Sequence, residues 1–145
     1  MERDNIQQIV GGVAKDFRGQ IRFVNDFDMS DVKRFYIIKN DNTDLIRGWR
    51  AHQIERRWFY VLSGKFQLDL VLIDNWEDAN KELPVKRIIL NENDHSVLAV
   101  SVGYATAFQA LEEGAELLVF ADYGIENAKL DDHTWPIDYF VNRIS

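Results

Sequence analysis

The chain has 145 residues, with 17 Lys and Arg against 24 Asp and Glu, which gives a formal net charge of −7. A hydrophobic content of 46% is enough for one core, so we expect one domain over residues 1–145 and exclude disorder. The acidic balance argues against a nucleic-acid partner, and the absence of cysteine excludes disulfides, thiolate nucleophiles and Cys-ligated metals.

The N-terminal residues lack a basic segment followed by an apolar one. No apolar run approaches the roughly 20 residues that span a bilayer. We therefore expect a cytoplasmic protein with no membrane partner.

Eight short apolar runs, each closed by a turn signal, are predicted to be strands. In chain order they are residues 20–27, 32–39, 58–62, 66–73, 85–90, 96–100, 106–111 and 115–121. The clearest alternation places Phe66, Leu68, Leu70 and Leu72 on one face, as expected for a half-buried antiparallel strand. Short helical pieces are predicted only near residues 6–10 and after Pro136.

The connections between these runs complete the fold prediction. Ser63-Gly64 and Glu113-Gly114 have the composition of tight hairpin turns, whereas residues 75–83 form a longer polar loop between two strands. Many short strands with little helical periodicity indicate an all-β sandwich or small barrel, whose mouth can hold one small ligand.

Four arginines lie close together in an otherwise acidic chain. This cluster can hold a small anionic ligand, although pairing with Asp44 and Glu55 as a solvated rim is the favoured interpretation from charge alone. The four are Arg47, Arg50, Arg56 and Arg57.

Of the three histidines, only His52 lies among other polar groups of interest. His95 follows a polar turn and His133 follows two aspartates, so both are expected to be exposed loop residues without a catalytic role.

An ordered set of motifs resembles the nucleotide-sugar-modifying cupins. These are the dTDP-4-dehydrorhamnose 3,5-epimerases and the dTDP-4-keto-6-deoxyhexose 3,4-ketoisomerases, including the WxcM-like proteins. The order and spacing of the motifs carry the resemblance over most of the chain. The matching segments are residues 16–21, 33–38, 47–52, 58–64, 101–108 and 121–123.

The resemblance implies a cupin jelly roll, commonly a homodimer, that acts on a nucleotide sugar in deoxysugar or surface polysaccharide biosynthesis. That chemistry needs a base beside a ketone, a group that stabilises the enolate, and an acid. The family motif is Arg-Gly-x-His or Arg-Gly-x-His-x-His, so Arg50 occupies the first histidine position and His52 the second. Because a guanidinium stays protonated, only His52 can act as the base.

Two interpretations follow from this substitution. In the catalytic one, His52 abstracts the proton, Arg50 or Arg47 holds the enolate or diphosphate, and Tyr36 or Tyr123 supplies the acid. A 3,4-ketoisomerase-like activity is then favoured over 3,5-epimerisation. In the other, a non-catalytic cupin only binds a sugar or nucleotide sugar.

Two further residues are candidates for substrate binding, Trp49 by stacking on the ligand and Arg57 by its charge. A role in packing explains the presence of Trp49 at least as well. Many cupins bind a metal through His-x-His, a glutamate and a later histidine, but Arg50 and Thr106 occupy two of these positions. We therefore predict no metal and no cofactor. The catalytic interpretation requires His52 and Tyr36 to face one cavity, and it fails if His52 lies outside the barrel.

Overall fold

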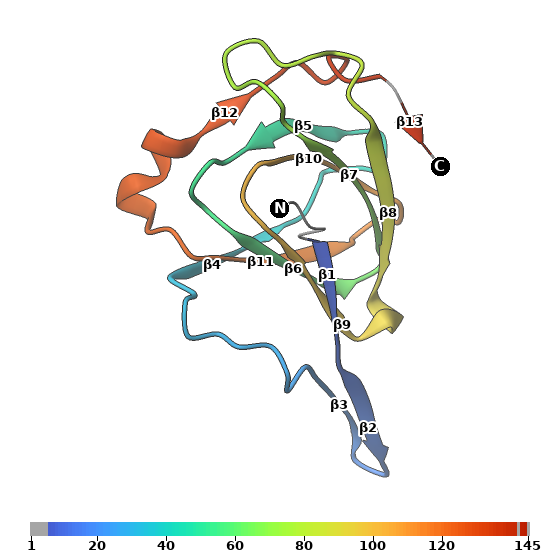
Figure 1. The fold of residues 1–145 in the computed structure, drawn as a ribbon. Helices are drawn as coiled ribbons and strands as arrows, with labels where there is room; N and C mark the ends of the chain where they lie inside the picture. The colour runs from blue at the N-terminus through green and yellow to red at the C-terminus, as the bar shows by residue number, and fades with distance from the viewer. Residues whose placement is uncertain (1–5, 142, 145) are drawn as a thin grey trace.

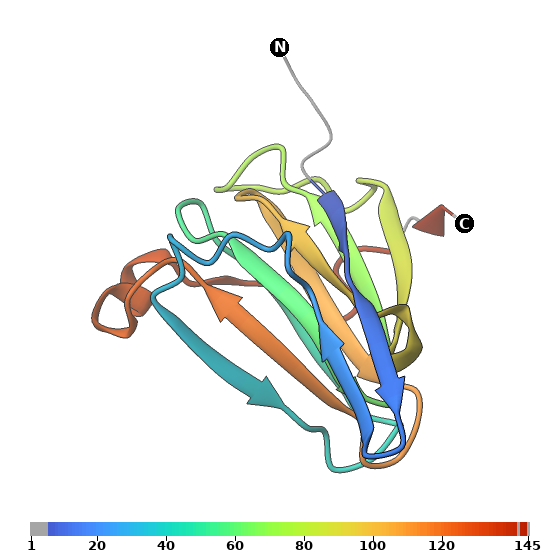
Figure 2. The ribbon, with the colours of Figure 1, turned by 90° about the horizontal axis from the view of Figure 1, so that it is seen from below.

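The structure is a computed structural model that describes residues 6–141 and 143–144. Two main antiparallel sheets face each other, and a separate hairpin projects from them (Figures 1 and 2). The first sheet has the order β1 (Ile6–Val10), β9 (Ser96–Val100), β6 (Arg57–Ser63), β11 (Glu116–Ala121), β4 (Arg34–Ile38).

The second sheet has the order β12 (His133–Thr134), β5 (Ile46–Ala51), β10 (Tyr104–Ala110), β7 (Lys65–Leu72), β8 (Val85–Asn91), β13 (Arg143–Ile144), with β13 parallel to β8. The hairpin consists of β2 (Gly12–Asp16) and β3 (Gly19–Phe23). Two short 3₁₀ helices, η1 (Glu92–Asp94) and η2 (Ile125–Asp131), complete the described elements. This arrangement confirms the prediction of an all-β jelly roll.

Two apolar clusters hold the second sheet from both sides. Phe66, Leu68 and Leu70 of β7 belong to the cluster between the two sheets. Val71, which points to the opposite face because side chains alternate along a strand, belongs to a second cluster with Phe140. The second sheet is therefore buried on both faces around β7, β10 and β5.

Each of the eight predicted runs overlaps a strand, but the two predicted helical pieces are wrong and one strand was missed. Residues 6–10 form strand β1 instead of a helix, because pairing with β9 outweighs the helix-like spacing of Ile6, Ile9 and Val10. The segment after Pro136 is a turn, in which the N–H of Tyr139 donates to the Pro136 carbonyl. Leu72 is 44% exposed at the end of β7. Strand β5, with its glycine and two arginines, was not predicted.

The two predicted hairpins are also wrong as pairings, although both turns exist. Gly64 and Gly114 each have φ +77°, a backbone conformation that favours glycine. Ser63-Gly64 joins β6 of one sheet to β7 of the other, and Glu113-Gly114 joins β10 to β11 in the same way. The chain therefore crosses between sheets at these turns. The polar loop at residues 75–83 does connect two paired strands, β7 and β8.

Within the described ranges, no helix is both long enough and apolar enough to cross a membrane.

Candidate active site

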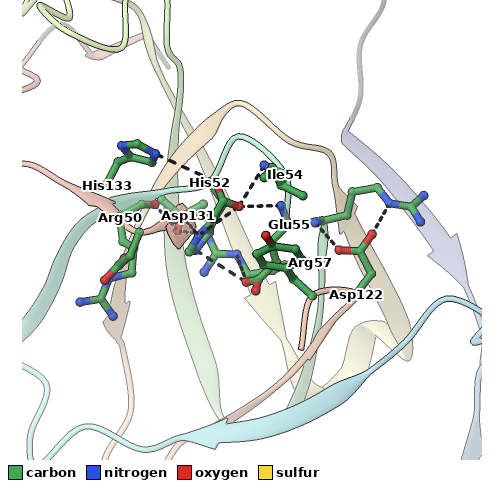
Figure 3. Close-up of polar contacts among 12 residues, drawn as sticks. Arg50, His52, Ile54, Glu55, Arg57, Asp122, Asp131 and His133 are labelled. Carbon is green, nitrogen blue, oxygen red and sulfur yellow. Dashed lines mark hydrogen bonds and ion pairs between the residues drawn. The ribbon is translucent and has the colours of Figure 1, made fainter. Parts of the chain in front are cut away.

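A buried carboxylate anchors the segment that carries His52. Asp131, 1% exposed at the end of η2, accepts hydrogen bonds from the backbone N–H groups of Gln53, Ile54 and Glu55 at 2.8, 2.9 and 2.8 Å. Three charge-assisted bonds to one carboxylate fix a loop strongly. The turn after β5 is therefore held against η2, as Figure 3 shows.

The imidazole of His52 is buried and has a defined tautomer. Its Nδ1 lies 2.6 Å from the carbonyl oxygen of Asp131. Because a carbonyl can only accept, Nδ1 carries the proton and Nε2 keeps its lone pair. Burial lowers the pKa of His52 to about 4; the charge of Arg57 adds to this shift, and Asp131 and Asp132 oppose it. His52 is therefore neutral at pH 7, the form that a general base requires.

Glu55 lies beside His52 and between two guanidinium groups. Its Oε1 accepts from Nη2 of Arg34 at 3.1 Å, and its Oε2 lies 3.7 Å from His52 Nε2 and 4.0 Å from Arg57 Nε. Burial raises the pKa of Glu55, while Arg57 and Arg34 act in the opposite direction. Oε2 is buried and has no hydrogen-bond partner in the described part of the chain.

Arg57 places a positive charge in the interior. It is 6% exposed, and its Nη2 donates to Oγ1 of Thr106 at 3.0 Å. The register of β4, β11 and β6 aligns Arg34, Ala121 and Arg57 in one row, which explains why both guanidinium groups reach Glu55. No group of three or more His, Asp or Glu side chains in the described ranges is arranged to hold a metal. A fixed guanidinium next to His52 also does not suit a bound cation, so the residues present do not fit the metal site of other cupins.

Two hollows meet at Tyr36 and Arg50. The first, of about 320 Å³, contains His52 and Tyr36 in its wall, so the two side chains line one hollow, and His52 is buried instead of facing solvent. The second, of about 390 Å³, adds more positive charge. The first is lined by Arg34, Tyr36, Arg50, His52, Glu55, Ile125, Lys129 and Asp132. The polar groups lining the second are Tyr36, Arg47, Arg50, Arg57 and Thr106.

The predicted arginine cluster is divided by the structure. Arg50 forms an ion pair with Asp132 (Nε to Oδ1, 2.9 Å), and Nε of Arg47 donates to Oδ1 of Asn40 at 2.9 Å. Arg56 instead pairs with Asp122 and Asp31 at 2.7 and 2.9 Å, and it lines neither of these two hollows. Arg47, Arg50 and Arg57 are therefore the members that face the candidate site.

Trp49 does not lie where a ligand can stack on it. It is 2% exposed, packs edge-to-face on Phe140 in the second apolar cluster, and its Nε1 donates to the carbonyl of Ile137 at 3.0 Å. Alternation along β5 directs Trp49 away from the interior face that carries Arg50. The prediction that Trp49 binds substrate is therefore corrected to a packing role.

The structure gives Tyr123 a backbone contact at the site, because its carbonyl accepts from Nε of Arg34 at 3.1 Å. Its side chain lines neither hollow. Of the two tyrosines predicted as the acid, only Tyr36 reaches the cavity, with the Arg34 guanidinium 5.2 Å from its ring centroid.

His133 and His95, predicted to be exposed loop residues, both lie in defined structural environments. His133, in β12, pairs with Ala51 of β5 and packs edge-on against the ring of Trp76. Its Nε2 lies 4.0 Å from Oδ1 of Asp131. His95 ends η1 in a left-handed conformation with φ 50° and has a buried Nδ1. Neither lines the hollow that contains His52.

Sequence reasoning missed three residues of this site: Arg34, Glu55 as a partner of His52, and Asp131. An acidic residue three positions after the motif histidine was a usable signal for Glu55. Asp131 is 79 residues from His52, so only the folded chain shows that the two meet.

Two facing antiparallel sheets with a polar hollow that contains His52 and Tyr36 define a jelly-roll protein of the cupin type. The model of the family described as FdtA, WxcM-like, C-terminal matches residues 4–135. The chain therefore belongs to the WxcM-like C-terminal (FdtA) family.

Solved structures with similar folds include sugar-modifying enzymes. A mutant of the 3,4-ketoisomerase QdtA from Thermoanaerobacterium thermosaccharolyticum, in complex with TDP-4-keto-6-deoxyglucose, is 22% identical with a TM-score of 0.68, covering 90% of this chain and 88% of that one. The dTDP-4-dehydrorhamnose 3,5-epimerase from Sulfolobus tokodaii is 20% identical with a TM-score of 0.74, covering 97% and 84%. A comparison with curated protein sequences finds no significant match.

Proposed function

We propose that the protein is a metal-independent isomerase of a dTDP-4-keto-6-deoxyhexose, with 3,4-ketoisomerisation favoured over 3,5-epimerisation. The observation that carries this proposal is that His52, with a free lone pair on Nε2, and Tyr36 line one hollow together with the guanidinium groups of Arg34 and Arg50. Family membership and the ligand in the QdtA structure support the substrate class. Deoxysugar or surface polysaccharide biosynthesis in the cytoplasm is the corresponding setting.

The chemistry follows from the charges around the hollow. Nε2 of His52 takes the proton from C3, the carbon next to the C4 keto group. The C–H electron pair forms the carbon–carbon double bond, and the carbonyl π pair moves to oxygen. The buried guanidinium of Arg57, or the exposed one of Arg50, offsets the negative charge on that oxygen.

Completion of the isomerisation needs two proton movements. Protonated His52 returns its proton to C4, while the C3 hydroxyl proton passes through Tyr36 to the C4 oxygen, so the keto group moves from C4 to C3. Tyr36 suits this exchange because a phenol both donates and accepts a hydrogen bond. Arg47 and Arg50, on the exposed side of the second hollow, suit the diphosphate.

A second candidate function is binding of a nucleotide sugar without catalysis. One specific observation favours it: Arg50 occupies the first histidine position of the motif and is engaged by Asp132 at 2.9 Å. In this alternative the hollow and its positive charges serve recognition alone.

Proton–deuterium exchange by NMR on dTDP-4-keto-6-deoxyglucose in heavy water distinguishes the two. We expect deuterium at C3 with the wild-type protein and none with His52→Asn, whereas His95→Asn, a matched change outside this hollow, exchanges normally. Exchange at C5 as well indicates epimerisation. Binding of the sugar without any exchange supports the non-catalytic candidate and overturns the proposal.

We also propose that the protein is a homodimer that uses the outer face of the first sheet. The register aligns Phe35, Phe120 and Trp58 in one outward row, in which Phe27 packs on Phe120 and on the buried Trp58. Phe35 and Ile37, on the edge strand β4, remain 63% and 51% exposed. Exposed apolar side chains side by side on one face are typical of protein interfaces, and a two-fold axis allows such a face to bury itself against its own copy.

A further inference from the structure

Glu55 belongs to the hollow that contains His52, yet the chemistry above gives it no part. It is 3% exposed, and it carries the buried Oε2 that has no hydrogen-bond partner in the described part of the chain. An unsatisfied buried polar atom is costly, so its retention calls for an explanation.

The position of Oε2 supplies one. It lies 3.7 Å from Nε2 of His52, the atom that takes the substrate proton, and 4.0 Å from Nε of Arg57. In the resting site Nε2 has no proton to donate, so no hydrogen bond forms between it and Glu55. Once Nε2 is protonated, its N–H needs an acceptor, and a small movement brings Oε2 within hydrogen-bond range.

The surrounding charges make such an acceptor necessary. A protonated His52 stands near the buried guanidinium of Arg57, and two like charges in a poorly solvated interior repel each other. Asp131 faces the opposite nitrogen, Nδ1, and Asp132 is already paired with Arg50. His133 lies beyond Asp131, and Arg34 holds the other oxygen of Glu55. Glu55 is thus the carboxylate next to Nε2.

We propose that Glu55 is a positioning residue for His52, whose carboxylate accepts a hydrogen bond from Nε2–H and stabilises the imidazolium formed when His52 takes the substrate proton. Arg34 holds Oε1, which leaves Oε2 directed at His52. This inference rests on the proposed function for its role in catalysis, but the pairing of Glu55 with His52 is a property of the free protein.

The test compares Glu55→Gln, which keeps the shape and removes the charge, with Glu113→Gln, the same change at an exposed turn. We expect Glu55→Gln to lower the rate of C3 deuterium exchange by about 10- to 100-fold with little change in KM. Glu113→Gln should leave both unchanged, and Glu55→Asp should restore part of the rate.

The results distinguish failure of this inference from failure of the proposed function. Exchange by the wild-type protein with an equal rate in Glu55→Gln overturns the role of Glu55 and leaves the isomerase proposal in place. No exchange by the wild-type protein overturns the isomerase proposal itself, and the role of Glu55 in catalysis with it. If Glu55→Gln does not fold, Glu55→Asp takes its place, and an exchange rate equal to that of the wild type overturns the role of Glu55.

Discussion

The carbonyl oxygen of Asp131 lies 2.6 Å from Nδ1 of His52. The carboxylate of the same residue accepts hydrogen bonds from three backbone N–H groups in the turn that follows His52. One residue of η2 therefore sets both the tautomer of the candidate base and the course of the chain after it. This arrangement connects the stability of the fold to the chemistry of the site.

Substitution of Asp131 by Asn should destabilise the protein. The amide nitrogen of Asn cannot accept, so at least one buried backbone N–H loses its partner, and the charge-assisted bonds become neutral ones. We expect a loss of about 2–4 kcal/mol in the free energy of unfolding, measured by urea denaturation. Asp138→Asn, at an exposed turn, is the control and should change stability by less than about 0.5 kcal/mol. Equal stabilities of the two variants would contradict the anchoring role.

The buried His52 should make stability fall in mild acid. The pKa is 6.5 in the unfolded chain and about 4 in the folded one. Between these values the unfolded state binds more protons, so stability declines as the pH is lowered from about 6.5 to 4. With the side chain only 9% exposed, the contribution approaches roughly 3 kcal/mol.

Glu55 contributes to the pH dependence of stability with the opposite sign, because its raised pKa makes the folded state bind its proton more tightly than the unfolded state does. The measurement is therefore the difference between wild type and His52→Asn in urea denaturation across pH 4–7. We expect the pH dependence of that difference to lie within the window from 6.5 to 4. A constant difference over this range would show that His52 is not held neutral by burial.

Binding of dTDP should weaken with salt and on loss of Arg47. This side chain is exposed, so its attraction for a diphosphate is screened over about 10 Å at 0.1 M salt. We expect Arg47→Gln to raise Kd by about 3- to 10-fold in calorimetry at low salt and by less at high salt. Arg18→Gln, on the projecting hairpin, removes the same charge and should leave Kd unchanged. Affinity that does not depend on salt would argue against this binding mode.

Phe35→Lys should convert a dimer into a monomer. Sedimentation velocity at micromolar concentration should show the wild-type chain as a dimer, because burial of the outer row of the first sheet removes apolar surface from water. A lysine in that row places a charge in the contact. Leu111→Lys, at a turn outside the sheet face, should remain dimeric. A monomeric wild type would remove the proposed interface.

The sequence predicted the positions of individual strands better than it predicted which strands pair with each other. The alternation in residues 66–70 predicts a strand with Phe66, Leu68 and Leu70 buried, and the structure agrees, since side-chain alternation is a local property of extended chain. Residues 6–10 and Ser63-Gly64 show the limit, because their local patterns suit a helix and a hairpin while distant strands determine the actual pairing.

The same division applies to the site. The sequence by itself determined the motif that resembles the family, the histidine predicted as the base, and the positive charges near it, because these depend on which residues occupy consecutive positions. Only the tertiary structure decided that Trp49 faces the second apolar cluster, that Arg34 and Arg57 converge on Glu55, and that Asp131 holds His52. The contact between His52 and Asp131 alone joins residues 79 positions apart, and the geometry of these contacts depends on strand register and on which face of each strand is buried.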